Sequence, residues 1–469
     1  MRGTSTTIRA ITAISTRTTT LKRSRLAPAW PVLSAIAWTL FAFGGLYAWT
    51  LVPLAALLLV GLIRIRPPII SADWQVDLAL ICCLVAVTVQ LIPLPPSVRA
   101  GLSPHLHEVE RTLQIERLGV APSFQSLSLA PDVTALSLAN LAMLIATFWL
   151  ARHVFESGAA RRVVRAIAWL GLVVSVAAIL QLAVSTLLIY GFWRPDDASA
   201  RPFGPFVNRN HMATWLVLCI PLTCGYLMAH MRARMHRRAG RDLAIVHAID
   251  STTIWQAGSG VMMISALFAS VSRSGVIALI TAATTGFVLA RAKLGVVRMK
   301  WLVGAAVFAL AIATYLANFD ELAGRFAEAL ERGNDRTEIW RQTLPIVRDF
   351  ALTGTGEGTF SRAMLVYQEG DRQLLFNHAH NQYLQIAAEG GLLVGVPALC
   401  AGLALVTVLF RRLRGDDTAL FWIRAGATAG LVGVAVQSLW ETGLRMPANG
   451  VLFAVCAALA VHEETRTDG

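Results

Sequence analysis

The chain has 469 residues, of which 55% are hydrophobic and only 15% are charged. Soluble domains carry about 25% charged residues, so this composition excludes an ordinary soluble protein and indicates an integral membrane protein. The net charge is +13, but the basic residues stand in short stretches between apolar runs, which excludes a nucleic-acid-binding protein with one basic face.

The N-terminal segment differs from the rest of the chain. Residues 1–28 are rich in Ser, Thr and Arg and contain no acidic residue. A transit peptide has this composition, and so does a disordered basic tail in the cytoplasm. We interpret residues 1–28 as such a tail and residues 29–469 as one multi-span membrane domain.

The apolar runs that follow predict a helical membrane protein. A bilayer core about 30 Å thick needs roughly 20 helical residues, and the sequence contains about twelve runs of that order. They lie near residues 30–45, 48–64, 74–95, 133–152, 164–190, 211–231, 254–271, 274–292, 300–317, 384–411, 419–438 and 447–462. The predicted fold is therefore all-α, a polytopic bundle of about twelve transmembrane helices.

The basic clusters set the orientation of these spans, because cytoplasmic loops are enriched in Lys and Arg. With the N-terminus in the cytoplasm, every internal loop contains such a cluster. The clusters are RIR (64–66), RRVVR (161–165), RARMHRRAGR (232–241), RAKLGVVRMK (291–300) and RRLR (411–414). This agreement predicts an even number of spans, with the N- and C-termini both cytoplasmic.

Three substantial loops remain on the opposite, extracytoplasmic face, near residues 96–132, 191–210 and 318–383. The third is too long to lack structure of its own unless it is functional. Its stretches LAGRFAEALERG (322–333) and EIWRQTLPIVRDF (338–350) have the pattern of amphipathic helices. We therefore expect a large extracytoplasmic loop that contains short helices.

Polar residues gather at the ends of these loops. Asn208 and Arg209 close the second loop, Arg273 lies in a short turn between two spans, and His378 and His380 end the third loop. Three separate regions of the sequence thus bring cations and a titratable group to one membrane face. A single arginine there often only reaches the headgroups, and a single loop histidine is often structural, so the combination carries the prediction.

These residue types suit transfer from an anionic, phosphate-linked lipid. Arginine pairs bidentately with phosphate and keeps its charge, so Arg209 and Arg273 can hold a diphosphate without a metal. Imidazole can accept a proton from a hydroxyl near neutral pH, which makes His380 a candidate general base. Asn381 and Glu389 can orient His380, and Glu389 can alternatively pair with an arginine.

Other motifs carry weaker hypotheses. Residues 354–358 (GTGEG) resemble a phosphate-binding loop, but no strand precedes them and a turn is the favoured interpretation. His378 and His380 have zinc-ligand spacing, yet all six cysteines lie in apolar runs and no third ligand is evident. We therefore predict no metal site and no cofactor.

The stretch HAHNQYLQIAAEGGLLVG (378–395) resembles the signature of the O-antigen ligase family, whose superfamily also contains O-antigen and exopolysaccharide polymerases. Similar pieces lie upstream: GPFVNRNHMATWL (204–216), SVSRSGVIAL around Arg273, and residues 334–360. The chain departs from the ligase pattern at Val394, where Gly, Thr or Tyr is expected and Gly395 comes one position late. This departure favours the broader superfamily over the true ligases.

The resemblance implies a metal-independent membrane glycosyltransferase with a GT-C-like fold in the bacterial inner membrane. Its donor would be an undecaprenyl-diphosphate-linked glycan, and its acceptor a lipid A-core sugar, a second glycan or a protein hydroxyl. The essential periplasmic histidine of the family maps to His380, and its arginines map to Arg209, Arg273 and Arg336. We expect Asn208, His378, Asn381 and Glu389 to contribute to substrate binding.

A transporter or flippase of the same anionic lipids is the alternative of a different class. Transporters commonly place ionisable groups near the middle of the bilayer. Here most spans lack central charges, and the polar residues lie at one face. This placement favours transfer over transport.

Overall fold

The computed structural model describes residues 28–113, 124–184, 188–196, 200–237, 249–291, 293–294, 304, 334–369, 376–416 and 418–463. Within these ranges the regular structure is helical, and the backbone forms only isolated bridges outside the helices. The predicted all-α class is therefore confirmed. Bilayers favour this class, because a helix satisfies its backbone hydrogen bonds internally.

Helices occupy the predicted apolar runs. They are α1 (Trp30–Phe41), α2 (Leu51–Ile65), α3 (Trp74–Val89), α6 (Pro131–Glu156), α7 (Ala160–Val184), α8 (Arg209–Arg237), α9 (Ser251–Ala269), α10 (Arg273–Arg291), α15 (Gln382–Arg414), α16 (Leu420–Gln437) and α17 (Pro447–Val461). The run 300–317 lies outside the described residues except for Gly304. Among the described residues, 7 helices could cross a membrane by length and composition, and three shorter helices are also apolar. The count of about twelve spans therefore stays a prediction.

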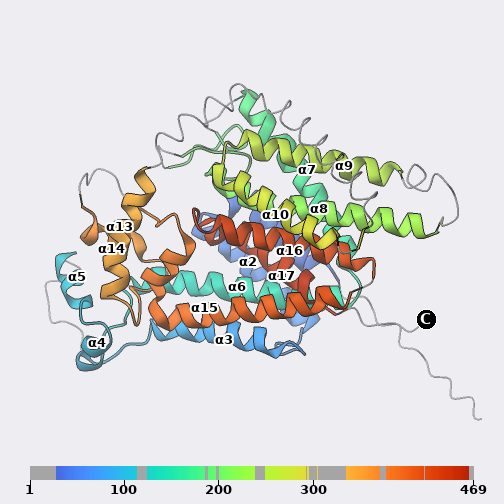
Figure 1. Ribbon diagram of the computed structural model, residues 1–469. Helices are drawn as coiled ribbons and strands as arrows, with labels where there is room; N and C mark the ends of the chain where they lie inside the picture. Colours follow the sequence, from blue (N-terminus) through green and yellow to red (C-terminus); the bar gives the residue numbers. More distant parts are fainter. Residues whose placement is uncertain are drawn as a thin grey trace, which may run out of the picture.

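The centre of the bundle is formed by α8 and α16, which pack against each other and are mostly buried. Glycines allow this close approach. A methyl group on Gly225 would lie 2.3 Å from the carbonyl oxygen of Trp422, and one on Gly426 would lie 2.3 Å from that of Pro221. Small residues commonly mediate such contacts between membrane helices. In contrast, α15 is largely exposed and packs on α3 at the edge of the bundle (Figure 1).

Four further helices lie together at one end of the bundle, in the left part of Figure 1. They are α4 (Pro96–Leu102), α5 (Leu106–Thr112), α13 (Asn334–Asp349) and α14 (Phe360–Tyr367). The predicted helix 338–350 is confirmed as α13, while 322–333 lies outside the described residues. Leu106, Ile346 and Phe360 share a small hydrophobic core in this region, which we call the cap. The cap is built from the first and third predicted extracytoplasmic loops.

The cap is tied to α15 at a break in that helix. Gly391 has φ 54° and ψ −153°, and the amides of Leu392 and Leu393 donate to the carbonyls of Ala351 and Leu352 at 2.8 and 2.9 Å. The glycine loop 354–358 packs against the same break, since a methyl group on Gly354 would lie 2.1 Å from the Glu389 carbonyl oxygen. This loop is therefore the predicted turn, and its glycines serve close packing.

Replacing Gly391 with alanine is expected to destabilise the protein by about 3 kcal/mol or more. Alanine rarely adopts this backbone conformation, and its methyl group would lie 2.6 Å from the Gly354 nitrogen. Gly402→Ala is the matched control in the same helix, since nothing lies within 4 Å of the added methyl group. Thermal unfolding of both purified variants in detergent checks the prediction, and equal melting temperatures would contradict it.

Candidate functional site

His380 lies at the junction between the cap and α15. Its backbone has φ 49°, a left-handed conformation that is uncommon for any residue other than glycine. The flanking groups hold this conformation: Ala379 N donates to Gln385 Oε1 at 3.1 Å, and Trp340 Nε1 donates to the Ala379 carbonyl oxygen at 2.9 Å. Such a conformation persists only where the surrounding structure holds it, as these two hydrogen bonds do here.

Asn381 begins α15 directly after His380. Its Oδ1 accepts hydrogen bonds from the amides of Tyr383 and Leu384, both at 3.0 Å, which is the geometry of a helix N-cap. The amide of Gln382 donates to the carbonyl of Ser438, at the end of α16. The Asn381 side chain thus fixes where α15 begins and thereby the position of His380.

A buried carboxylate, Glu441, faces His380 from the segment between α16 and α17. Its Oε1 lies 3.8 Å from His380 Nδ1, and its Oε2 lies 3.8 Å from Arg336 Nη2 on α13. The Glu441 side chain is only 2% exposed, compared with 34% for His380. Burial raises the pKa of Glu441, but His380, His211 and Arg336 outweigh burial and lower it to about 2. Glu441 is therefore ionised at neutral pH.

Arg445 lies one turn further along the same segment and pairs with two carboxylates. Its Nη2 contacts Glu389 and lies 2.7 Å from Glu357 Oε1. The fully buried Glu389 also accepts hydrogen bonds from the amide of Phe360 at 2.9 Å and from Gln385 Nε2 at 3.2 Å. Of the two roles considered for Glu389, the pairing with an arginine is the one observed.

Replacing Arg445 with methionine is expected to destabilise the protein by about 3–5 kcal/mol, because the buried Glu389 carboxylate loses its cation. Arg341→Met is the matched control: Arg341 also pairs with two carboxylates, Glu338 and Glu369, but its side chain is 59% exposed. There we expect little change in stability, because water screens an exposed ion pair. Urea or thermal unfolding of the two variants separates these expectations, and equal losses would refute them.

His378 lies two residues before His380, and Gln385 Nε2 is 3.4 Å from its Nδ1. Burial lowers the pKa of His378 to about 3, and the nearby Arg445 acts in the same direction. His378 is therefore neutral at physiological pH. The part of the chain described by the structure contains no group of three or more His, Cys, Asp and Glu residues that could hold a metal ion.

Arg209 and Arg273 each begin a helix, and the two helix starts are adjacent. The amide of Arg209 donates to the carbonyl of Arg201 at 3.1 Å, and Asn208 Oδ1 accepts from the amide of Asn210 at 2.8 Å. A methyl group on Gly275, two residues after Arg273, would lie 2.7 Å from Ala213 Cβ in the first turns of α8. The structure therefore brings the predicted arginines to neighbouring helix ends.

The same end of the bundle connects to Glu441 and Arg445. Asn449 Nδ2 at the start of α17 donates to the carbonyls of His211 and Gly443, at 3.0 and 2.9 Å. His211 lies two residues after Arg209, and Gly443 lies between Glu441 and Arg445. The segments that carry Arg209, Glu441 and His380 thus meet at one end of the bundle.

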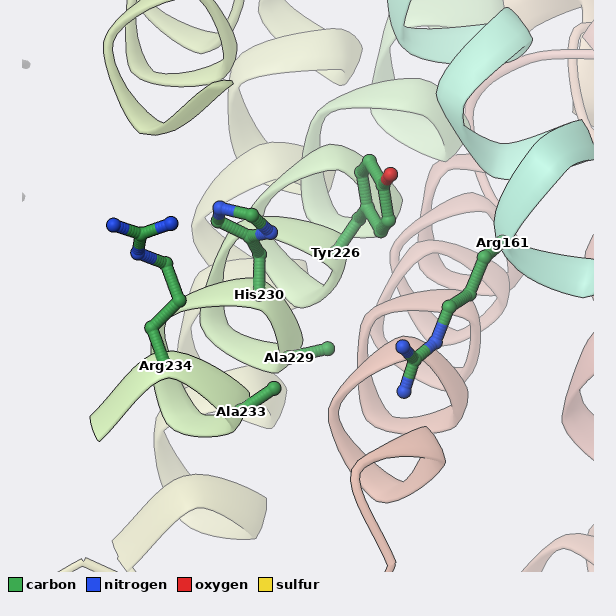
Figure 2. Close-up of a pocket in the computed structure, with 6 residues that line it drawn as sticks. All are labelled: Arg161, Tyr226, Ala229, His230, Ala233 and Arg234. Carbon is green, nitrogen blue, oxygen red and sulfur yellow. The ribbon is translucent and has the colours of Figure 1, made fainter. Parts of the chain in front are cut away.

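A cavity of about 150 Å³ lies toward the other end of α8 (Figure 2). Its lining residues are Arg161, Tyr226, Ala229, His230, Ala233 and Arg234. At 1.5 Å per residue these α8 positions lie roughly 30 Å from Arg209, and the predicted topology places them on the cytoplasmic side. This cavity contains none of the predicted site residues.

Part of the chain is similar to a known protein family. Residues 258–399 match the family model described as O-antigen ligase, while the comparison with curated proteins gives no match. Residues 258–399 are therefore similar to an O-antigen ligase family domain. The predicted resemblance to this superfamily is thereby confirmed, and the apolar helices make the chain a multi-pass membrane protein.

The matched residues include Arg273, Arg336 and His380, but not all of the residues that meet near His380. Arg209, Glu441 and Arg445 lie outside the matched residues. Glu441 and Arg445 were not predicted from the sequence. A signal was available, since both stand in a short polar segment between the last two apolar runs, on the face predicted for His380.

Proposed function

We propose that this protein transfers a glycan from an undecaprenyl-diphosphate-linked donor to an acceptor hydroxyl at the periplasmic face of the bacterial inner membrane. One observation supports this proposal best: His380 meets the segments that carry Arg209, Arg273 and Arg336 at one end of the bundle. Of these residues, all but Arg209 lie within the part of the chain that matches the O-antigen ligase family model. In this proposal the N- and C-termini are cytoplasmic, the bundle is GT-C-like, and the reaction needs no metal or cofactor.

The arginines bind the diphosphate of the donor. Guanidinium groups pair bidentately with phosphate oxygens and stabilise the negative charge that develops as the diphosphate leaves. Arg209 and Arg273 at the two helix starts take this role. Arg336, whose side chain is 33% exposed, binds the same diphosphate from the cap helix α13. Asn208 and His378 line the acceptor side, with His378 as a neutral hydrogen-bonding group.

His380 is the general base. The acceptor oxygen attacks the anomeric carbon, its proton passes to the imidazole, and the bond from that carbon to the diphosphate oxygen breaks with its electron pair leaving on the lipid diphosphate. Asn381 caps the start of α15 and so holds His380 in place, while Glu389 pairs with Arg445. A direct displacement of this kind inverts the anomeric configuration.

The test is transfer by the purified protein in lipid vesicles, supplied with a labelled polyprenyl-diphosphate glycan and acceptors of each class, with EDTA present. We expect a product of inverted configuration. A trapped covalent glycosyl-enzyme would overturn direct displacement. Movement of a fluorescent lipid diphosphate across the vesicle bilayer, without any transfer and unaffected by His380→Ala, would instead support the transporter alternative.

The acceptor is identified in cells. Lipopolysaccharide and exopolysaccharide are analysed in cells lacking the protein and in cells complemented with it. Single repeats that still cap the lipid A-core would identify a polymerase, because only chain extension is lost. Accumulated long lipid-linked chains with uncapped core would identify a ligase.

A further inference from the structure

The His380 imidazole faces the carboxylate of Glu441. The atoms concerned, His380 Nδ1 and Glu441 Oε1, are 3.8 Å apart, and Nδ1 is buried without a hydrogen-bond partner among the described residues. The other carboxylate oxygen, Oε2, is buried and equally without a hydrogen bond within the described ranges. A shift of about 1 Å would bring Nδ1 and the carboxylate to charge-assisted hydrogen-bond distance. Hydrogen bonds of catalytic groups are often this long before substrate binds.

We propose that Glu441 is the positioning residue of His380. It accepts the Nδ1–H hydrogen bond, which leaves the Nε2 lone pair directed at the acceptor hydroxyl. When the hydroxyl proton arrives on Nε2, the Glu441 carboxylate stabilises the imidazolium that forms. The inference rests on the proposed function, in which His380 is the base, and adds a group from outside the matched residues 258–399.

The position of Glu441 in the fold supports this role. An ionised carboxylate only accepts hydrogen bonds, so it selects the imidazole form that carries hydrogen on Nδ1. The carboxylate is held in place, because Oε1 accepts from the amide of Thr442 at 3.1 Å and the side chain is almost fully buried. A buried, fixed carboxylate loses little entropy when it orients its partner.

A purely structural carboxylate would only balance Arg336, whose Nη2 is 3.8 Å from Oε2. The two roles differ in how activity responds to pH. The charged and titratable groups around His380 are Glu441, Arg336 on α13, His211 on α8 and the neutral His378. Removal of the Glu441 charge therefore makes the His380 imidazolium less favourable, whereas removal of Arg336 makes it more favourable.

The experiment measures kcat and kcat/KM for glycan transfer against pH, using a synthetic polyprenyl-diphosphate glycan and the full-length protein. For Glu441→Gln we expect kcat to fall by about 10²-fold or more. We also expect the acid limb of the kcat/KM profile to move to lower pH. Glu441→Asp keeps the charge and is expected to retain part of the rate. Glu338→Gln, an exposed carboxylate on α13, is the control.

Arg336→Gln keeps the inference testable even if Glu441 variants do not accumulate, because Arg336 is partly exposed. For Arg336→Gln the acid limb of the kcat/KM profile should move to higher pH, whereas for Glu441→Gln it should move to lower pH. If both Glu441→Gln and Arg336→Gln lower the rate but leave the acid limb of the kcat/KM profile in place, the positioning role is overturned. Full activity of Glu441→Gln would overturn it as well. If His380→Ala keeps activity, the proposed base itself fails, which distinguishes failure of the proposed function from failure of this inference.

Discussion

Replacing His380 with alanine is expected to lower glycan transfer by about 10³-fold or more while leaving the protein folded. General-base catalysis contributes about 10²–10⁴-fold, and the Glu441 carboxylate loses its partner as well. The side chain of His380 is one-third exposed, so its removal leaves no large cavity in the core. Transfer by the purified variant in vesicles is the measurement, with abundance and melting temperature recorded in parallel.

His105→Ala is the matched control for this experiment. His105 is an exposed histidine of the cap, directly before α5. We expect it to retain full transfer, because no side-chain hydrogen bond or ion pair within the described ranges joins His105 to His380, Glu441 or Arg336. Wild-type transfer rates in His380→Ala would show that His380 is not the general base, even if the arginines bind the diphosphate as proposed. Loss of activity in both variants would show that the cap tolerates no substitution.

Much of the fold follows from the sequence because the bilayer imposes a length and a polarity on each helix. The predicted run 384–411, for example, falls within α15, and 419–438 coincides with α16 to within a residue. The break at Gly391 inside α15 was not predicted. It depends on hydrogen bonds to Ala351 and Leu352, which stand about forty residues earlier, and no local pattern encodes such a contact.

The candidate site was predictable in part for the same reason. Alternating membrane topology placed Arg209, Arg273 and His380 on one face, and the structure brings the segments that carry them to one end of the bundle. The carboxylates were harder to assign, because a buried Glu389 and a buried Glu441 look alike in sequence. Only the fold shows that Arg445 pairs with the first and that His380 faces the second.

Replacing Arg273 with alanine is expected to lower kcat/KM by about 10²–10³-fold, the loss typical of one fixed donor to a developing anion. Arg273→Lys should recover only part of this loss, because an ammonium group lacks the planar fork that pairs with two phosphate oxygens. Arg291→Ala is the control, since Arg291 ends the same helix at the predicted cytoplasmic side and should change activity by about twofold or less. The measurement is initial transfer rate against donor concentration. Equal losses at Arg273 and Arg291 would mean that α10 only stabilises the bundle, and the diphosphate would then have to be bound by Arg209 and Arg336 alone.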